Sequence, residues 1–213
     1  MPMFPTVEVR WFHRGETPSD VTEWFLRDEP SPDQQPRRID HYLRLGQRDS
    51  IGIKLREGRI EVKRRQHRHG VVRFHDQIAG VVESWRKWSL PFAALGGDLA
   101  NAAMPAASWI AVQKARLLRK YQIVGEGQLV SVPAEVFPVQ GCSVELTGVH
   151  TQGEAWWTLA FEAFGKASTR YDYLVLAAET VLAREGGPFL FDPRDSYGYP
   201  RWLALLQEME TLR

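Results

Sequence analysis

The chain has 213 residues, of which 44% are hydrophobic and 25% are charged, a composition typical of a soluble globular protein. Its formal net charge of +1 argues against a molecule whose whole surface binds nucleic acid. The single cysteine, Cys142, excludes an internal disulfide, and the N-terminus has no apolar signal core, so a cytoplasmic protein is expected. No stretch is apolar over the length that a membrane span needs, so no membrane partner is expected.

The first half of the chain is predicted to form mainly strands. Residues 6–12 alternate between polar and apolar β-formers, as a half-buried strand does. The stretch from 14 to 36 is polar and proline-rich, which predicts a loop with a short helical turn at 20–26. Glu57-Gly58 is typical of a tight hairpin turn. Further strands are predicted at 38–45, 50–56, 59–65 and 81–90.

The second half is predicted to combine strands with two helices. Residues 95–108 are rich in small side chains and are expected to be irregular, whereas β-branched and aromatic residues favour a strand at 109–121. Two more strands are predicted at 143–150 and 155–164. Apolar residues at helical spacing predict a helix at 168–184, ended by Gly186-Gly187, and a terminal helix is expected at 199–212. About eight strands and two late helices are thus expected in one domain spanning residues 1–213.

Charged side chains recur on one face of the predicted strands, opposite an apolar face. A half-buried antiparallel sheet with its polar face in water explains this alternation. Two observations favour a face that meets an anion instead. Residues 37–68 carry 11 basic side chains against four acidic ones, and neighbouring like charges destabilise a sheet unless something neutralises them. Glutamates recur among the cations, which suits a site for phosphate and a divalent metal ion; they are Glu8, Glu61, Glu83, Glu145 and Glu162.

The order of these segments resembles the triphosphate tunnel metalloenzyme superfamily, whose fold is called CYTH-like. That family's barrel opens with a Glu-x-Glu-x-Lys strand, and residues 6–10 read Thr-Val-Glu-Val-Arg at the same place. Segments similar to its later charged strands and terminal Ser-Tyr-x-x-Leu helix lie at 53–56, 62–65, 83–87, 114–116, 119–121, 144–149, 157–162 and 195–203. The resemblance covers nearly the whole chain. It implies an α+β, mostly β fold, namely an eight-stranded antiparallel tunnel barrel with C-terminal helices.

The resemblance also implies a site in which cations clamp a triphosphate chain while carboxylates hold Mg²⁺ or Mn²⁺. The phosphate-binding residues would be Arg10, Lys54, Arg56, Lys63, Arg65, Lys114 and Arg116. The metal ligands would be Glu8 and Glu162, with Glu145. The sequence departs from the family pattern where Thr6 and Ala160 replace acids, which weakens a divalent site, and where Arg10 replaces lysine.

Three functions are compatible with the sequence, which identifies no catalytic residue. The first is a Mg²⁺- or Mn²⁺-dependent triphosphate hydrolase that needs no protein nucleophile. The second is a non-catalytic relative that binds a phosphorylated anion, which the missing acids favour. The third, disfavoured by the net charge, is a nucleic-acid-binding barrel with tryptophans as stacking platforms; these would be Trp11, Trp85, Trp88, Trp109, Trp156 and Trp157.

The expected partner is therefore a small phosphorylated anion, whose identity the sequence leaves open together with the oligomeric state. Three histidines lie at and just beyond the end of the basic segment, but no cysteine accompanies them, so a solvated loop is expected there rather than a metal cluster. They are His67, His69 and His75.

Overall fold

The computed structural model describes residues 3–28, 30–91, 108–125, 127–133, 135–185 and 190–211. Within these ranges the strands are β1 (Met3–Arg14), β2 (Asp33–Leu43), β3 (Ile51–Arg56), β4 (Arg59–His75), β5 (Ile78–Pro91), β6 (Trp109–Val124), β7 (Gln128–Val132), β8 (Gly141–Thr151) and β9 (Glu154–Phe164). The helices are α1 (Ser19–Leu26), α3 (Arg170–Leu182) and α4 (Tyr199–Thr211), with a 3₁₀ turn η3 (Pro193–Asp195).

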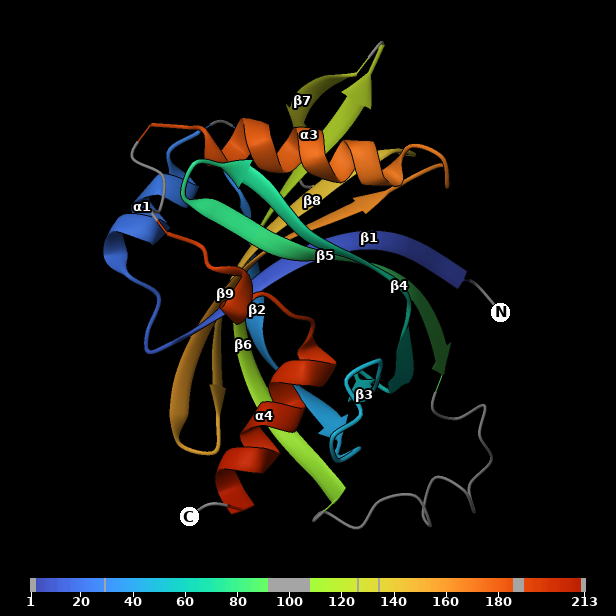
Figure 1. Cartoon of the computed structure of the whole chain (residues 1–213), viewed down its shortest axis with the longest axis vertical. Helices are drawn as coiled ribbons and strands as arrows, with labels where there is room; N and C mark the ends of the chain where they lie inside the picture. The colour runs from blue at the N-terminus through green and yellow to red at the C-terminus, as the bar shows by residue number, and fades with distance from the viewer. Residues whose placement is uncertain are drawn as a thin grey trace.

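Eight of these strands close into an antiparallel barrel (Figure 1). Their order is β2-β3-β4-β5-β1-β9-β8-β6, and the pairing of β2 with β6 completes the ring, while β7 extends one end of β6. The fold class predicted from the sequence, a mostly β barrel with C-terminal helices, is confirmed. Closure leaves the barrel with two wall surfaces, one facing its lumen and one facing outward.

Two hairpins turn through a pair of residues with positive φ, and one of them is the Glu57-Gly58 turn predicted from the sequence. Glu57 and Gly58 between β3 and β4 have φ angles of 49° and 70°, and Gln152 and Gly153 between β8 and β9 have φ angles of 54° and 77°. Two successive residues with positive φ form the turn whose twist matches the right-handed twist of paired strands. The glycine at the second position adopts this conformation without a steric penalty.

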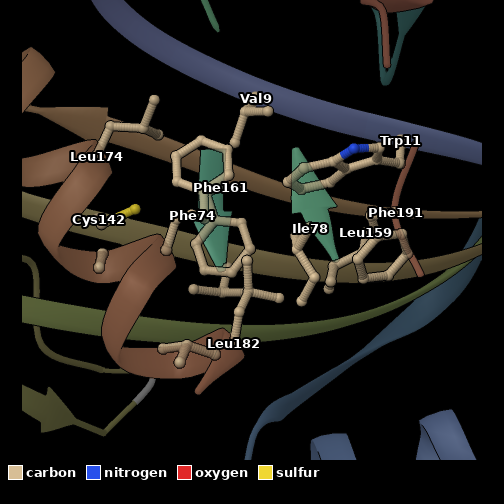
Figure 2. Close-up of a cluster of buried hydrophobic side chains, with 14 of the residues drawn as sticks. Val9, Trp11, Phe74, Ile78, Cys142, Leu159, Phe161, Leu174, Leu182 and Phe191 are labelled. Atoms are coloured by element: carbon tan, nitrogen blue, oxygen red, sulfur yellow. The ribbon is translucent and has the colours of Figure 1, made fainter. Parts of the chain in front are cut away.

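The larger apolar core lies outside the barrel wall. Val7, Val9 and Trp11 on the outward face of β1 pack with β8, β9, α3 and the far ends of β4 and β5 (Figure 2). Trp11 is fully buried, and its indole Nε1 donates to the Ala79 carbonyl at 2.8 Å. Because the apolar faces of the strands are used here, their polar faces are left to line the lumen.

A second apolar cluster closes one end of the lumen. Phe12 and Trp156, from the inward faces of β1 and β9, pack against Trp202 and Leu206 of α4. The ring of Phe12 stacks on that of Trp202 with 5.0 Å between their centroids. α4 therefore covers the barrel at this end, and the charged inward positions lie beyond it.

The structure corrects three sequence-based predictions. β2 begins at Asp33, inside the predicted loop, because a bulge between Gln35 and Arg38 accommodates Pro36. β4 runs on to His75, so the three histidines lie on a strand, and three register shifts against β5 break the alternation that would have revealed it. The short strand β7 was not predicted.

Other predicted elements are confirmed, including the strand at 109–121 and the two late helices. Except for Ser108, the stretch predicted to be irregular lies outside the described residues, as do Gly186 and Gly187. Among the helices in the described ranges, none has the length and apolar character needed to cross a membrane.

Candidate anion-binding cavity

A cavity of about 130 Å³ lies in the lumen, bordered by inward-facing side chains of all eight barrel strands and by the first turn of α4. Gly52 on β3 faces Pro200 of α4, and a Cβ at position 52 would lie 3.2 Å from the Pro200 ring. The missing side chain therefore lets α4 approach the rim. The basic lining residues are Arg10, Arg38, Lys54, Arg56, Lys63, Lys87, Lys114 and Arg116.

These eight cations outnumber the carboxylates around them in the part of the chain that the structure describes. Glu61, Glu145 and Glu162 line the cavity. Glu8 and Asp40 are buried behind it and bond to lining cations. Glu57 on the β3–β4 turn pairs with Arg56 at 3.5 Å. With six carboxylates against eight cations, the described residues of the site keep an excess of two positive charges. An anion that reaches the deep end of the lumen, where Arg10 and Lys114 are 5% exposed, would meet charges that water screens less than at the surface.

Asp40 is the centre of one group of cations. Its carboxylate is fully buried and lies 3.1 Å from Lys114 Nζ, 3.2 Å from Lys54 Nζ and 3.3 Å from Arg38 Nε. Burial alone would raise the pKa of Asp40, but these three cations lower it well below its usual range. Asp40 thus stays ionised and holds two ammonium groups and one guanidinium group at the lumen wall.

Lys114 is held by aromatic side chains as well as by Asp40. Its Nζ donates to the Tyr42 hydroxyl at 2.7 Å and lies 3.8 Å from the centroid of the Tyr199 ring. Burial lowers the pKa of Lys114 to about 8, although Asp40 pulls in the opposite direction. Burial also raises the pKa of Tyr199 to about 12, so this ring stays neutral against the ammonium.

A second network runs through Arg10. Its Nε lies 2.9 Å from Glu8 Oε1 and its Nη2 lies 3.2 Å from Glu145 Oε1. Arg116 Nη1 binds the other oxygen of Glu145 at 2.9 Å, and Lys63 Nζ binds the other oxygen of Glu8. Burial would raise the pKa of Glu145, but Arg116 and Arg10 lower it far below normal.

Like charges face each other directly across two pairs of strands in the cavity wall. Lys63 of β4 is opposite Lys87 of β5, and Arg38 of β2 is opposite Lys114 of β6. Directly opposed like charges destabilise a sheet. Asp40 offsets the second pair, since it bonds to both members. In the first pair, Lys63 binds Glu8, whereas Lys87 makes no ion pair among the described residues and is opposed only by the nearby Glu61, whose pKa it lowers.

One hydroxyl group in the wall also lacks a partner. Thr147 of β8 lines the cavity and is 1% exposed, and its Oγ1 makes no hydrogen bond within the described residues. Leaving a buried hydroxyl unpaired is costly unless a water molecule or a ligand satisfies it. This donor lies on the same face of its strand as Glu145, among the cations.

The structure gathers most of the residues predicted from the sequence. Of the seven predicted cations, all but Arg65 line the cavity. Arg65 instead binds Glu83 at 2.9 Å and Asp49 at 2.9 Å. Glu145 and Glu162 line the cavity, whereas Glu8 lies beneath Arg10 and Lys63.

Several lining residues were not predicted. Arg38 and Tyr42 share the inward face of β2 with Asp40, and Lys87 shares that of β5 with Glu83, so strand parity could have indicated them. Tyr199 comes from α4, and no local pattern shows that this helix folds back onto the barrel.

The carboxylates predicted as metal ligands do not fit a divalent ion as they stand. Both oxygens of Glu8 and of Glu145 accept hydrogen bonds from cations, and Glu162 lies 4.0 Å from Lys63 Nζ. A Mg²⁺ or Mn²⁺ ion needs several oxygen ligands directed at it. In the described ranges no three His, Cys, Asp or Glu side chains are grouped so that they could hold a metal ion.

The histidines and tryptophans considered for metal or nucleic-acid binding do not line the cavity. His67 and His69 are exposed on β4, with 4.6 Å between their ring centroids, and they do not line the cavity. Four of the six tryptophans considered as stacking platforms are buried in the packing of the barrel; they are Trp11, Trp85, Trp156 and Trp157. A buried indole cannot stack on a nucleic-acid base, so this alternative loses its main support.

No family model matches the chain, and no curated protein sequence matches it significantly. Among solved structures, the PH1819 protein of Pyrococcus horikoshii OT3 is similar at 14% identity and a TM-score of 0.47, with 96% of this chain and 99% of that chain covered. A conserved hypothetical protein from Pyrococcus furiosus is similar at 10% identity and a TM-score of 0.43, with 94% and 99% covered. Both likenesses are too distant to indicate what this chain binds.

Proposed function

We propose that the barrel binds a small phosphorylated anion of the triphosphate class in its lumen. The observation that carries this proposal is the excess of two positive charges among the described residues around the lumen, with Lys63 and Lys87 directly opposed. A chain of phosphate groups would offset this excess and accept charge-assisted hydrogen bonds from several strands at once. The resemblance to the triphosphate tunnel family supports the same class of ligand.

The wall offers two depths of contact for such a chain. Arg10 and Lys114 are each 5% exposed and lie deep in the lumen, whereas Arg56 and Lys63 are 25% and 27% exposed. One end of the anion would meet the deep cations and the hydroxyl of Thr147. The other end would meet the more accessible ones, so that a longer phosphate chain makes more contacts than a single phosphate.

Binding has more support than hydrolysis. Metal-dependent hydrolysis needs a divalent ion to stabilise the leaving group and orient water, and the carboxylates expected to hold it are engaged by cations. Among the functions compatible with the sequence, the geometry therefore favours a non-catalytic protein that binds a phosphorylated anion. Phosphate release from tripolyphosphate with Mg²⁺, measured beside binding, would reveal hydrolysis.

Isothermal titration calorimetry with phosphate, pyrophosphate and tripolyphosphate tests the proposal. Affinity should rise with chain length. Arg56→Gln should weaken tripolyphosphate binding by about tenfold or more, because it removes one charge-assisted hydrogen bond. Arg64→Gln is the matched control, since Arg64 is exposed on the opposite face of β4 from Lys63. Absence of tripolyphosphate binding at millimolar concentration, or an equal loss in both variants, would refute the proposal.

A further inference from the structure

Three glutamates lie side by side across the barrel wall. In the strand register, Glu8 of β1 is directly opposite Glu83 of β5 on one side and Glu162 of β9 on the other. Directly opposed residues have Cβ atoms about 5 Å apart, so three carboxylates in this row would repel one another if nothing stood between them. Carboxylate oxygens are the ligands that divalent cations prefer, although these three are not grouped so as to hold one as they stand.

Cations of the protein itself occupy this row. The Lys63 ammonium donates to Glu8 Oε2 and lies 4.0 Å from Glu162 Oε1, so it bridges two of the three carboxylates. Arg10 takes the other oxygen of Glu8 at 2.9 Å, and Arg65 lies 2.9 Å from Glu83 Oε1. The position between Glu8 and Glu162 is therefore already filled by a positive charge that cannot diffuse away.

Lys63 and Glu8 hold each other in their charged forms. Burial would lower the pKa of Lys63, but Glu8 and Glu162 raise it above its ordinary value. Burial would likewise raise the pKa of Glu8, but Lys63 and Arg10 lower it. Lys63 also lines the cavity, so the same ammonium faces the carboxylates on one side and the lumen on the other.

We propose that the Lys63 ammonium takes the place of a divalent cation, so that the cavity selects the metal-free form of its phosphorylated anion. This inference rests on the proposed function for the identity of the ligand. An anion complexed with Mg²⁺ carries less negative charge and brings a further cation into a wall that already has excess positive charge. The metal-free anion keeps its full charge and receives the counter-charge from Lys63 and its neighbours.

Metal binding by the carboxylates can be measured without any anion. Removing the ammonium leaves Glu8 and Glu162 adjacent and without a bridging charge, and such a pair should attract a divalent ion. Lys63→Ala should therefore acquire a Mn²⁺ site that the wild-type protein lacks. Lys87→Ala is the matched control, because Lys87 lies opposite Lys63 in register but makes no ion pair with Glu8 or Glu162 among the described residues.

Electron paramagnetic resonance titration of Mn²⁺ into phosphate-free protein tests this consequence. Lys63→Ala should bind one ion, and the wild-type protein and Lys87→Ala should bind none at the same concentrations. The double variant Lys63→Ala/Glu162→Gln should lose the site. Stoichiometric Mn²⁺ binding by the wild-type protein that Glu162→Gln removes would overturn the inference, and so would a folded Lys63→Ala, verified by circular dichroism, that binds no Mn²⁺.

Calorimetry with tripolyphosphate tests the selection itself. The wild-type protein should bind tripolyphosphate in EDTA, and excess Mg²⁺ should weaken binding by about tenfold or more. A requirement for Mg²⁺ would overturn the inference. If tripolyphosphate binds under neither condition, the proposed function fails, whereas the Mn²⁺ titration still decides whether Lys63 stands in for a metal ion.

Discussion

Burial in the lumen alters the acid–base chemistry of Lys114. It is 5% exposed, lies 3.1 Å from Asp40 and packs against the Tyr199 ring. Burial lowers its pKa to about 8 despite the attraction of Asp40. Because a lysine in water keeps its proton to much higher pH, the cavity loses one positive charge in a range where an exposed lysine would not.

Anion binding should therefore depend on the protonation of Lys114. As pH rises from 7 to 9, Lys114 in the free protein loses its proton, so tripolyphosphate affinity should fall and binding near pH 8 should take up a proton. Calorimetry in buffers of different ionisation enthalpy measures both effects. Lys114→Arg is the control, since arginine keeps its charge and reports any titration of the ligand itself. Identical pH profiles for the two proteins would contradict this role.

Alternate residues of a strand point to opposite faces, and this rule explains which residues of the site could be predicted from the sequence. Arg10 and Lys54 each lie between two apolar neighbours and Lys63 follows Val62, and that pattern placed them on the lumen side. The same parity misplaced Arg65, because its partners Glu83 and Asp49 draw it away from the cavity. Contacts of this kind depend on which strands become neighbours, and that information is not local.

At the scale of elements, β5 packs closely against β1 through a glycine. A Cβ at Gly80 would lie 2.5 Å from a ring carbon of Trp11 and 2.6 Å from a methyl group of Val9. Both side chains are at most 1% exposed and are enclosed by the core, so neither can move aside easily. The close approach of the two strands thus depends on the absence of a side chain at this position.

Gly80→Ala should lower the free energy of unfolding by about 1–3 kcal/mol, the usual cost of overpacking a core. Gly148→Ala is the matched control on β8, because its nearest contact would be Thr17 at an ordinary 3.7 Å. Urea denaturation of both variants measures the difference. Equal stabilities of the two variants would show that the Trp11 contact does not restrain the packing.

The elements that could be predicted are those with regular alternation or helical spacing. β2 was recognised only in part, because Pro36 and the bulge beside it have the composition of a loop. β7 is five residues long and follows Gly125 and Gly127, so its sequence is hard to distinguish from a turn. In both cases pairing with β6 stabilises a strand that its own residues favour only weakly.

At the scale of the whole molecule, a nearly neutral chain concentrates positive charge in one enclosed space. The net charge is +1, yet the described residues of the cavity and the carboxylates bonded to them keep an excess of two positive charges. The order of strands that creates this space brings together distant segments, such as Arg10 and Thr158. Alternation could predict the charged faces but not their closure, which only the resemblance to a known barrel implied.

If the excess positive charge in the lumen binds an anion, Lys87→Gln should change both the stability of the free protein and its stabilisation by tripolyphosphate. Urea unfolding should be measured for this variant and the wild-type protein, each with and without tripolyphosphate. Without the anion, Lys87→Gln should raise the free energy of unfolding by about 0.2–1 kcal/mol, because it removes the repulsion from Lys63. With the anion, the variant should gain less stability than the wild-type protein, since stabilisation by a ligand follows its affinity. A variant that is less stable without the anion, yet gains as much stability from it as the wild-type protein, would contradict the account.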